Sequence, residues 1–404
     1  MLSEKAIDKL IQPLINRQSQ IEGVVISSIA ERLKDIKTVT PSDIYKLERL
    51  LKSGSDVKDI NKKIAKLTKM SENDIKKIIK TVAADGYKDA KPFYDYRHKS
   101  YIPFEKNIEL QNSIKAIERA TLADYTQLSN STAFMLRDMA NPLILRPTSV
   151  SKTYNKIIDT AIQSVVGGLD TYNQVIPNSI QQLIDSGIKT VEYTTEQGKK
   201  HYVRLDSVVK RNILDGIRNV QQEVQNITGE QFGANGVEIS VHQFSAPDHE
   251  PVQGHQLTKE EFEKMQLGEN FEDVNGIKFT GFDRPIGVWN CRHISWNVIL
   301  EHKTSNYTLE QLEELKQKNA NGITVKNKQG NNEVRSMYWC TQRRNNYELQ
   351  IKQLKEGQAM AEKAMQNELA SKYNNKVVSV QNKYIAFCKS CGLKPRFENT
   401  RIFV

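Results

Sequence analysis

The sequence predicts a helix-rich α+β protein made of three consecutive regions. Apolar residues recur at three- and four-residue spacing over long stretches at both ends of the chain, which is typical of amphipathic helices. Between these stretches, short segments alternate apolar and polar residues, as strands do. We therefore expect an N-terminal helical region at residues 1–150, a small α+β domain with a β-hairpin at 151–305, and a long C-terminal helical arm at 306–404.

Helix-capping residues divide the N-terminal region into short predicted helices. Thr40 and Pro41 are typical of a helix start. Ser55 and Ser71 predict two further starts, and Gly86 predicts the end of the last helix. Each predicted helix is apolar on one side only, so the helices must pack against one another or against a partner. A helix-turn-helix that reads DNA bases is the weaker interpretation, because no residue here singles out base recognition.

The rest of this region is predicted to be a loop followed by one more helix. Residues 91–104 are rich in Tyr and Pro and have the composition of a loop. A helical pattern then runs from about Asn107 to Met139. Pro142 and Pro147 follow it and mark the first domain boundary.

The middle region combines predicted helices with strands. Helical patterns cover residues 156–166, 178–185 and 207–228. Residues 191–195 and 201–205 alternate in polarity around a turn at Gly198, which predicts a β-hairpin. The alternating segment 237–242 predicts one more strand.

The C-terminal region predicts one very long helix. Residues 333–387 keep helical spacing for over fifty residues, with Gly357 as the single weak point. Ordinary globular helices span about 8–20 residues, so this length indicates a coiled-coil arm or a strut that docks on other subunits. We therefore expect assembly, including oligomer formation through the C-terminal helix.

The positive charge of the chain lies mainly in two segments. Of the net charge of +10, residues 41–91 carry +5 and residues 306–404 carry +8, which leaves −3 for the remainder. Basic segments attract nucleic acid or acidic protein surfaces. Lysines interleaved with acidic residues are equally typical of ordinary solvent-exposed helix faces, so the charge alone does not decide function.

Composition excludes several classes of protein. Hydrophobic residues make up 38% and charged residues 26%, which is too apolar for a disordered chain. The sequence has neither the roughly 18 consecutive apolar residues of a membrane-spanning helix nor a secretory signal, so we expect synthesis in the cytoplasm and no membrane partner. Four irregularly spaced cysteines do not indicate a disulfide framework. No glycine-rich phosphate-binding loop is present, so no nucleotide cofactor is expected.

Histidines concentrate in the middle region. Five of the seven lie between residues 242 and 302, and Cys291 lies among them. Imidazole and thiolate are common ligands of tetrahedral zinc. The candidate zinc ligands are His242, His249, Cys291 and His293. Their spacing matches no zinc finger or ribbon, and a buried hydrogen-bond network that includes Arg292 explains the same residues without a metal.

Catalytic interpretations of these residues are weaker. Cys291 and His293 could form a nucleophile pair if their side chains touched, but no acid or oxyanion-stabilising feature accompanies them. His293, Asn297 and His302 are too closely spaced for a ββα nuclease site. The CxxC at 388–391 has neither a second pair to complete a metal site nor a thioredoxin-like context. We therefore expect no enzyme activity and no catalytic residue.

Two short blocks of the middle region carry a resemblance to a known family. The blocks consist of His242, His249 and Gly254, and of Gly287, Asn290, Cys291, Arg292 and His293. With the helices around them, most of residues 150–404 resembles the phage minor capsid protein 2 family of tailed-phage head proteins, related to the Mu-F-like head morphogenesis group.

The resemblance implies a low-copy structural protein of the virion head that acts at or near the portal during head assembly. The implied location is the capsid interior or the portal vertex, and the implied partners are the portal protein and the head shell proteins. Packaged DNA could be contacted through its phosphates. A DNA-associated protein that is packaged and ejected with the genome, or a zinc-dependent enzyme, are the alternatives. No cofactor is required by the resemblance, and zinc remains a candidate.

Overall fold

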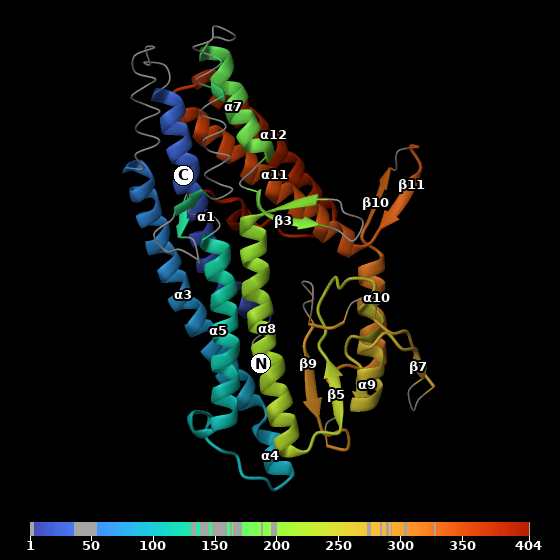
Figure 1. Cartoon of the computed structure of the whole chain (residues 1–404). Helices are drawn as coiled ribbons and strands as arrows, with labels where there is room; N and C mark the ends of the chain where they lie inside the picture. The colour runs from blue at the N-terminus through green and yellow to red at the C-terminus, as the bar shows by residue number, and fades with distance from the viewer. Residues whose placement is uncertain are drawn as a thin grey trace. The chain divides into compact units, whose positions relative to one another are not determined.

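The computed structural model describes most of the chain as two compact units (Figure 1). The described residues are 4–35, 55–130, 135–137, 145–147, 160–161, 164, 172–186, 189–194, 200–272, 276–282, 285–287, 291, 293–302, 305–326 and 329–403. Unit 1 consists of residues 1–11, 75–122 and 211–343. Unit 2 consists of residues 12–74, 123–210 and 344–404. Each unit is assembled from three separate stretches of chain.

Helices dominate the described residues, and several small antiparallel sheets accompany them, so the predicted helix-rich α+β class is confirmed. The long helices are α1 (Glu4–Asp35), α3 (Ser55–Asp89), α5 (Ile108–Asn130), α7 (Tyr172–Ser186), α8 (Leu205–Phe232), α11 (Met337–Lys363) and α12 (Asn367–Ser390). In the part of the chain that the structure describes, no helix is both long enough and apolar enough to cross a membrane.

Helix α3 continues through the start and stop that the sequence predicted inside it. Ser71, expected to cap a new helix, is fully buried, and its hydroxyl accepts a hydrogen bond from Nη1 of Arg17 at 3.4 Å. Gly86, expected to end the helix, lies buried within it. The prediction of two helices is therefore wrong, because the Ser71 hydroxyl bonds a residue of α1 and does not cap its own helix. The predicted start at Thr40 lies outside the described residues.

The apolar stripe predicted for this segment is confirmed. Its buried members are Ile64, Ile75, Ile78, Ile79 and Val82.

The segment expected to be a loop contains a short helix, α4 (Lys91–Tyr96), and a 3-10 turn, η2 (Phe104–Lys106). Proline in the first turn of α4 is tolerated there because the missing N–H has no intrahelical acceptor. The helix predicted next is confirmed as α5, but it ends at Asn130. The expected end at Met139 is wrong, because Met135–Arg137 forms strand β1, which pairs with β2 (Leu145–Pro147).

A three-stranded antiparallel sheet lies in unit 1, with β5 (Gly236–Ile239) between β6 (Gln256–Thr258) and β9 (Ser295–Val298). The predicted strand at 237–242 is thus confirmed, although it ends at Ile239. Helix α9 (Lys259–Gln266) follows β6 directly. A core of buried side chains forms beside the sheet. It contains Ile239, Val252, Leu257, Met265, Phe279, Phe282 and Ile286.

Helix α8 packs directly against β9. The backbone N–H of Asn297 donates to Oε1 of Gln225 at 3.2 Å, and its side-chain amide donates to the Gln225 carbonyl at 2.7 Å. Gly229 faces the same side chain, and a Cβ there would lie 2.4 Å from Nδ2 of Asn297. The absence of a side chain at Gly229 therefore lets the helix and the strand approach closely.

The remaining strands form two-stranded sheets. Strands β3 (Lys189–Thr194) and β4 (Lys200–Arg204) pair antiparallel, which confirms the predicted hairpin. The other pairs are β7 (Phe271–Glu272) with β8 (Lys278–Phe279), and β10 (Ile323–Lys326) with β11 (Asn332–Arg335). Helix α10 (Leu309–Ala320) precedes β10. The predicted helices at 178–185 and 207–228 are confirmed as α7 and α8, whereas 156–166 lies largely outside the described residues.

The C-terminal helical region is confirmed, but it is two antiparallel helices and not one strut (Figure 1). Gly357, the expected weak point, is buried inside α11. The chain reverses at Met365, whose φ of 57° is left-handed. The N–H of Gln366 bonds the Ala361 carbonyl at 2.8 Å, and the N–H of Met365 bonds the Glu362 carbonyl at 3.0 Å. This is a Schellman ending with methionine where glycine is usual, which is why the sequence did not indicate it.

Unit 2 is held together by contacts between its helices. Nζ of Lys352 on α11 lies 3.4 Å from Oε2 of Glu22 on α1, and both side chains are buried. The hydroxyl of Tyr373 on α12 donates to Oε1 of Gln181 on α7 at 2.7 Å. The C-terminal helices therefore pack within the chain itself. The division of the chain into regions 1–150, 151–305 and 306–404 stays a prediction.

Candidate functional site

The candidate site of unit 1 lies in two loops beside the three-stranded sheet. His242 and His249 follow β5, and Cys291 and His293 precede β9. Hydrogen bonds extend the β5–β9 pairing into these loops, because the N–H of Ser240 donates to the Ile294 carbonyl at 2.8 Å. The strand pairing therefore brings together residues more than forty positions apart in the sequence.

Three of the four predicted side chains converge on one point. Sγ of Cys291 lies 3.3 Å from Nδ1 of His249 and 3.6 Å from Nδ1 of His293. These three atoms lie within 4.8 Å of one another. The exposed fractions of His249, Cys291 and His293 are 0%, 3% and 2%, so the cluster is closed to solvent. We call these three residues the His–Cys–His cluster.

The outer nitrogen of each imidazole in the cluster faces an oxygen. Nε2 of His249 lies 3.8 Å from Oδ2 of Asp248, and Nε2 of His293 lies 3.4 Å from Oε1 of Gln253. Oε1 of Gln253 also accepts the backbone N–H of His242 at 3.3 Å, which identifies it as the carbonyl oxygen. Asp248 and Gln253 were not singled out from the sequence, because only the folded loop places them behind the two rings.

The surroundings of Cys291 favour its thiolate. Burial raises the pKa of the thiol, but hydrogen bonds from His249 and from the backbone N–H groups of Gly287 and His293 outweigh burial. The pKa of Cys291 therefore lies below its ordinary value. The backbone nitrogen of His293 lies 3.4 Å from the sulfur of Cys291 and donates its hydrogen to it.

His242 lies next to the cluster without joining it. Its ring centre is 4.2 Å from that of His293, and its Nδ1 contacts the Gln243 carbonyl at 3.2 Å. Burial lowers the pKa of His242, so the ring is neutral at neutral pH. The structure thus places His242 as a neighbour of the cluster.

Both predicted glycines have left-handed backbones. The φ of Gly254 is 77° and that of Gly287 is 88°. A Cβ on Gly254 would also lie 2.5 Å from Cδ2 of Leu312 on α10, so space as well as conformation requires glycine there. At Gly287 nothing lies within 4 Å of the Cβ position, so only the backbone requires glycine. Asn290 and Arg292 lie outside the described residues.

The residues weighed as a nuclease site do not come together with the cluster. The side chain of Asn297 bonds α8, and the ring of His302 stacks on Tyr96 with centroids 3.9 Å apart. In the CxxC of unit 2, Cys388 and Cys391 are buried at the end of α12. The N–H of Leu393 bonds the Cys388 carbonyl at 2.8 Å, and Gly392 has a φ of 65°, so this motif forms a helix terminus.

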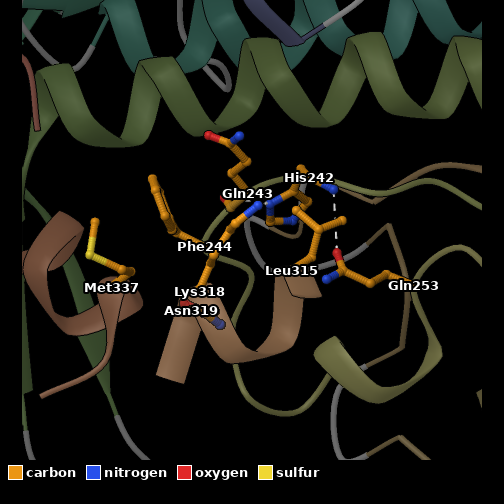
Figure 2. Close-up of a pocket in the computed structure, with 8 residues that line it drawn as sticks. All are labelled: His242, Gln243, Phe244, Gln253, Leu315, Lys318, Asn319 and Met337. Atoms are coloured by element: carbon orange, nitrogen blue, oxygen red, sulfur yellow. Dashed lines mark hydrogen bonds between the residues drawn. The ribbon is translucent and has the colours of Figure 1, made fainter. Parts of the chain in front are cut away.

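A pocket of about 220 Å³ adjoins the cluster, and Figure 2 shows its lining. Its walls are His242, Gln243, Phe244, Gln253, Leu315, Lys318, Asn319 and Met337. Among the described residues, His242 and Gln253 belong to both the pocket wall and the surroundings of the cluster, and the dashed hydrogen bond in Figure 2 joins them. The cluster itself does not line the pocket. A substrate in the pocket would therefore not touch Cys291.

Comparison with known proteins agrees with the predicted resemblance. The family model of phage minor capsid protein 2 matches residues 2–389, which is nearly the whole chain. No curated protein matches significantly, and neither does any solved structure. Because the match covers far more than half of the chain, the protein belongs to the phage minor capsid protein 2 family, and its location is the virion.

Proposed function

We propose that this phage minor capsid protein acts at or near the portal vertex as a structural component in head assembly. The observation that carries the proposal is the family match over residues 2–389. A structural role requires no catalytic residue, and the closed His–Cys–His cluster offers no access to a substrate. The proposed partners are the portal protein and the head shell proteins, and the proposed position is the capsid interior or the portal vertex.

Helix α12 supports a role in assembly, because it presents two different stripes to solvent. Val378 and Ile385, exposed by 48% and 44%, lie two turns apart on one stripe. A second stripe is here called the α12 lysine stripe, and its members lie within about 40° of one another on the helical wheel. It consists of Lys372, Lys376 and Lys383, all exposed. The first stripe suits an apolar protein surface, and the second suits a negatively charged one.

The position at the portal is tested on purified particles. Quantitative peptide mass spectrometry, normalised to the major shell protein, is made before and after triggered genome release, and cross-linking identifies neighbours. We expect a low, fixed copy number that is retained in empty heads, with cross-links to the portal protein. A copy number that follows the shell protein, or cross-links to shell proteins alone, would contradict a position at the portal.

A second candidate function is association with the packaged genome. The observation that favours it is the α12 lysine stripe, together with the complete absence of Asp and Glu from residues 371–390. Phosphates of packaged DNA are an abundant negative surface inside a head. In the particle experiment, this role predicts presence in full heads and loss on emptying, so the same measurement separates the two candidates.

A further inference from the structure

We propose that His249, Cys291 and His293 bind a zinc ion that fixes the loop after β5 to the segment before β9. The proposal stands on the geometry of unit 1 and does not depend on the role of the protein in the virion. The cluster supplies three of the four ligands of a tetrahedral zinc ion, and all three side chains are closed to solvent and to the adjoining pocket.

The two sulfur–nitrogen distances within the cluster are those of a zinc site. Zinc lies about 2.3 Å from a thiolate sulfur and about 2.0–2.1 Å from an imidazole nitrogen, so a tetrahedral angle separates sulfur and nitrogen by about 3.5 Å. The two sulfur–nitrogen distances are 3.3 and 3.6 Å.

Polar contacts of the outer nitrogens orient the rings for metal binding. The carbonyl oxygen of Gln253 accepts from Nε2 of His293, so in the neutral ring that nitrogen carries the hydrogen and Nδ1 presents its lone pair to the sulfur. Oδ2 of Asp248 lies 3.8 Å from Nε2 of His249, so it faces the hydrogen that this nitrogen would carry once Nδ1 binds the ion. Imidazoles that bind zinc usually donate their second N–H to a carboxylate or carbonyl in this way.

Without metal, the sulfur of Cys291 accepts hydrogen bonds from His249 and from the backbone N–H of His293. A zinc ion would take the place of the hydrogen on Nδ1 of His249 and bind the thiolate and both imidazoles together.

The experiment measures metal in the full-length chain, prepared without an affinity tag. After exposure to Zn²⁺ and removal of loosely bound metal, elemental mass spectrometry should find one zinc per chain. With Co²⁺ in its place, a thiolate-to-metal charge-transfer band should appear together with the visible bands of tetrahedral cobalt. Cys291→Ala and His249→Ala should lose both the stoichiometric zinc and the charge-transfer band.

Matched controls come from the other cysteines of the chain. Cys340 is a fully buried thiol of the same unit, and Cys388 and Cys391 form the CxxC of unit 2. Cys340→Ala and the double variant Cys388→Ala/Cys391→Ala should keep one zinc and the cobalt spectrum. Asp248→Asn leaves all three ligands in place and should weaken zinc binding about 10- to 100-fold.

Loss of folding in a variant is separated from loss of metal by a measurement on the unchanged chain. Zinc should protect Cys291 from alkylation in native protein, as read by peptide mass spectrometry, whereas Cys340 should react equally with and without zinc. The proposal is overturned if the unchanged chain takes up no stoichiometric zinc. It is equally overturned if Cys291→Ala binds zinc as the unchanged chain does.

Discussion

Replacing Glu348 by alanine should destabilise the α11–α12 hairpin against local unfolding. Oε1 of Glu348 accepts from the hydroxyl of Tyr384 at 3.0 Å and from Nε of Arg396 at 3.0 Å. Its Oε2 accepts from Nη2 of Arg396 at 2.9 Å and from Nδ2 of Asn399 at 2.8 Å. One buried carboxylate therefore joins α11, α12 and the C-terminal segment.

The expected loss follows from what the substitution leaves behind. Removing one partner of a buried ion pair typically costs about 3–5 kcal/mol, because the other charge remains without compensation. The side chain of Arg396 is 26% exposed, so water takes over part of its solvation. We therefore expect Glu348→Ala to lower the free energy of local unfolding by about 2–4 kcal/mol.

Hydrogen exchange read by mass spectrometry is the suitable assay, because local opening of one hairpin need not follow global unfolding. Peptides from residues 384–400 should exchange about 30- to 1,000-fold faster, which is the same free energy at 1.4 kcal/mol per tenfold. Glu362 provides the control, since it is exposed on the same helix and accepts a hydrogen bond from Gln358 one turn away. Glu362→Ala should change the free energy by less than about 0.5 kcal/mol. Equal exchange in the two variants would refute the reasoning.

Three further predictions concern a glycine, a tyrosine and a charged surface. Gly254→Ala should destabilise unit 1 by about 1–3 kcal/mol in thermal unfolding, from the left-handed φ and the contact with Leu312. Burial, and next the neighbouring Tyr87, raises the pKa of Tyr101 to about 12. Because the folded pKa exceeds the unfolded value of 10, this contribution to stability is complete below pH 10 and is lost as the pH rises toward 12. Changing the α12 lysine stripe to glutamine should reduce the salt slope of DNA binding by about 0.9 for each phosphate that the helix no longer neutralises.

Each of these has a matched comparison. Gly330 has a φ of 83° but nothing within 4 Å of its Cβ position, so Gly330→Ala should cost less than Gly254→Ala. Equal costs would show that Leu312 adds nothing. In an absorbance titration of tyrosinate, the ionisation near pH 12 should disappear in Tyr101→Phe, and its persistence would assign it to another tyrosine. Burial raises the pKa of Tyr94 and Tyr384 further, so these two tyrosines ionise later in both proteins. Lys316→Gln on α10, where the lysine pairs with Glu313, should leave the salt slope of DNA binding unchanged.

The sequence predicted much of the candidate site, but the structure supplied what orients it. His249, Cys291 and His293 were recognisable because imidazole and thiolate seldom concentrate in one region without a chemical or structural reason. Their convergence could not be inferred from spacing, since it depends on the antiparallel pairing of β5 with β9. Asp248 and Gln253 carried no signal at all, because they act only through the outer nitrogens of two folded rings.

The sequence by itself determined the class of fold, the hairpin at 189–204 and the buried stripes of the long helices. These properties follow from periodicity over a few residues, which the local backbone geometry fixes. The tertiary structure decided where helices continue or stop. Ser71 lies inside α3 because Arg17 bonds its hydroxyl, and the chain reverses at Met365 because α12 packs back on α11. Local preferences of about 1 kcal/mol are outweighed by such long-range contacts, and these depend on residues far apart in the sequence.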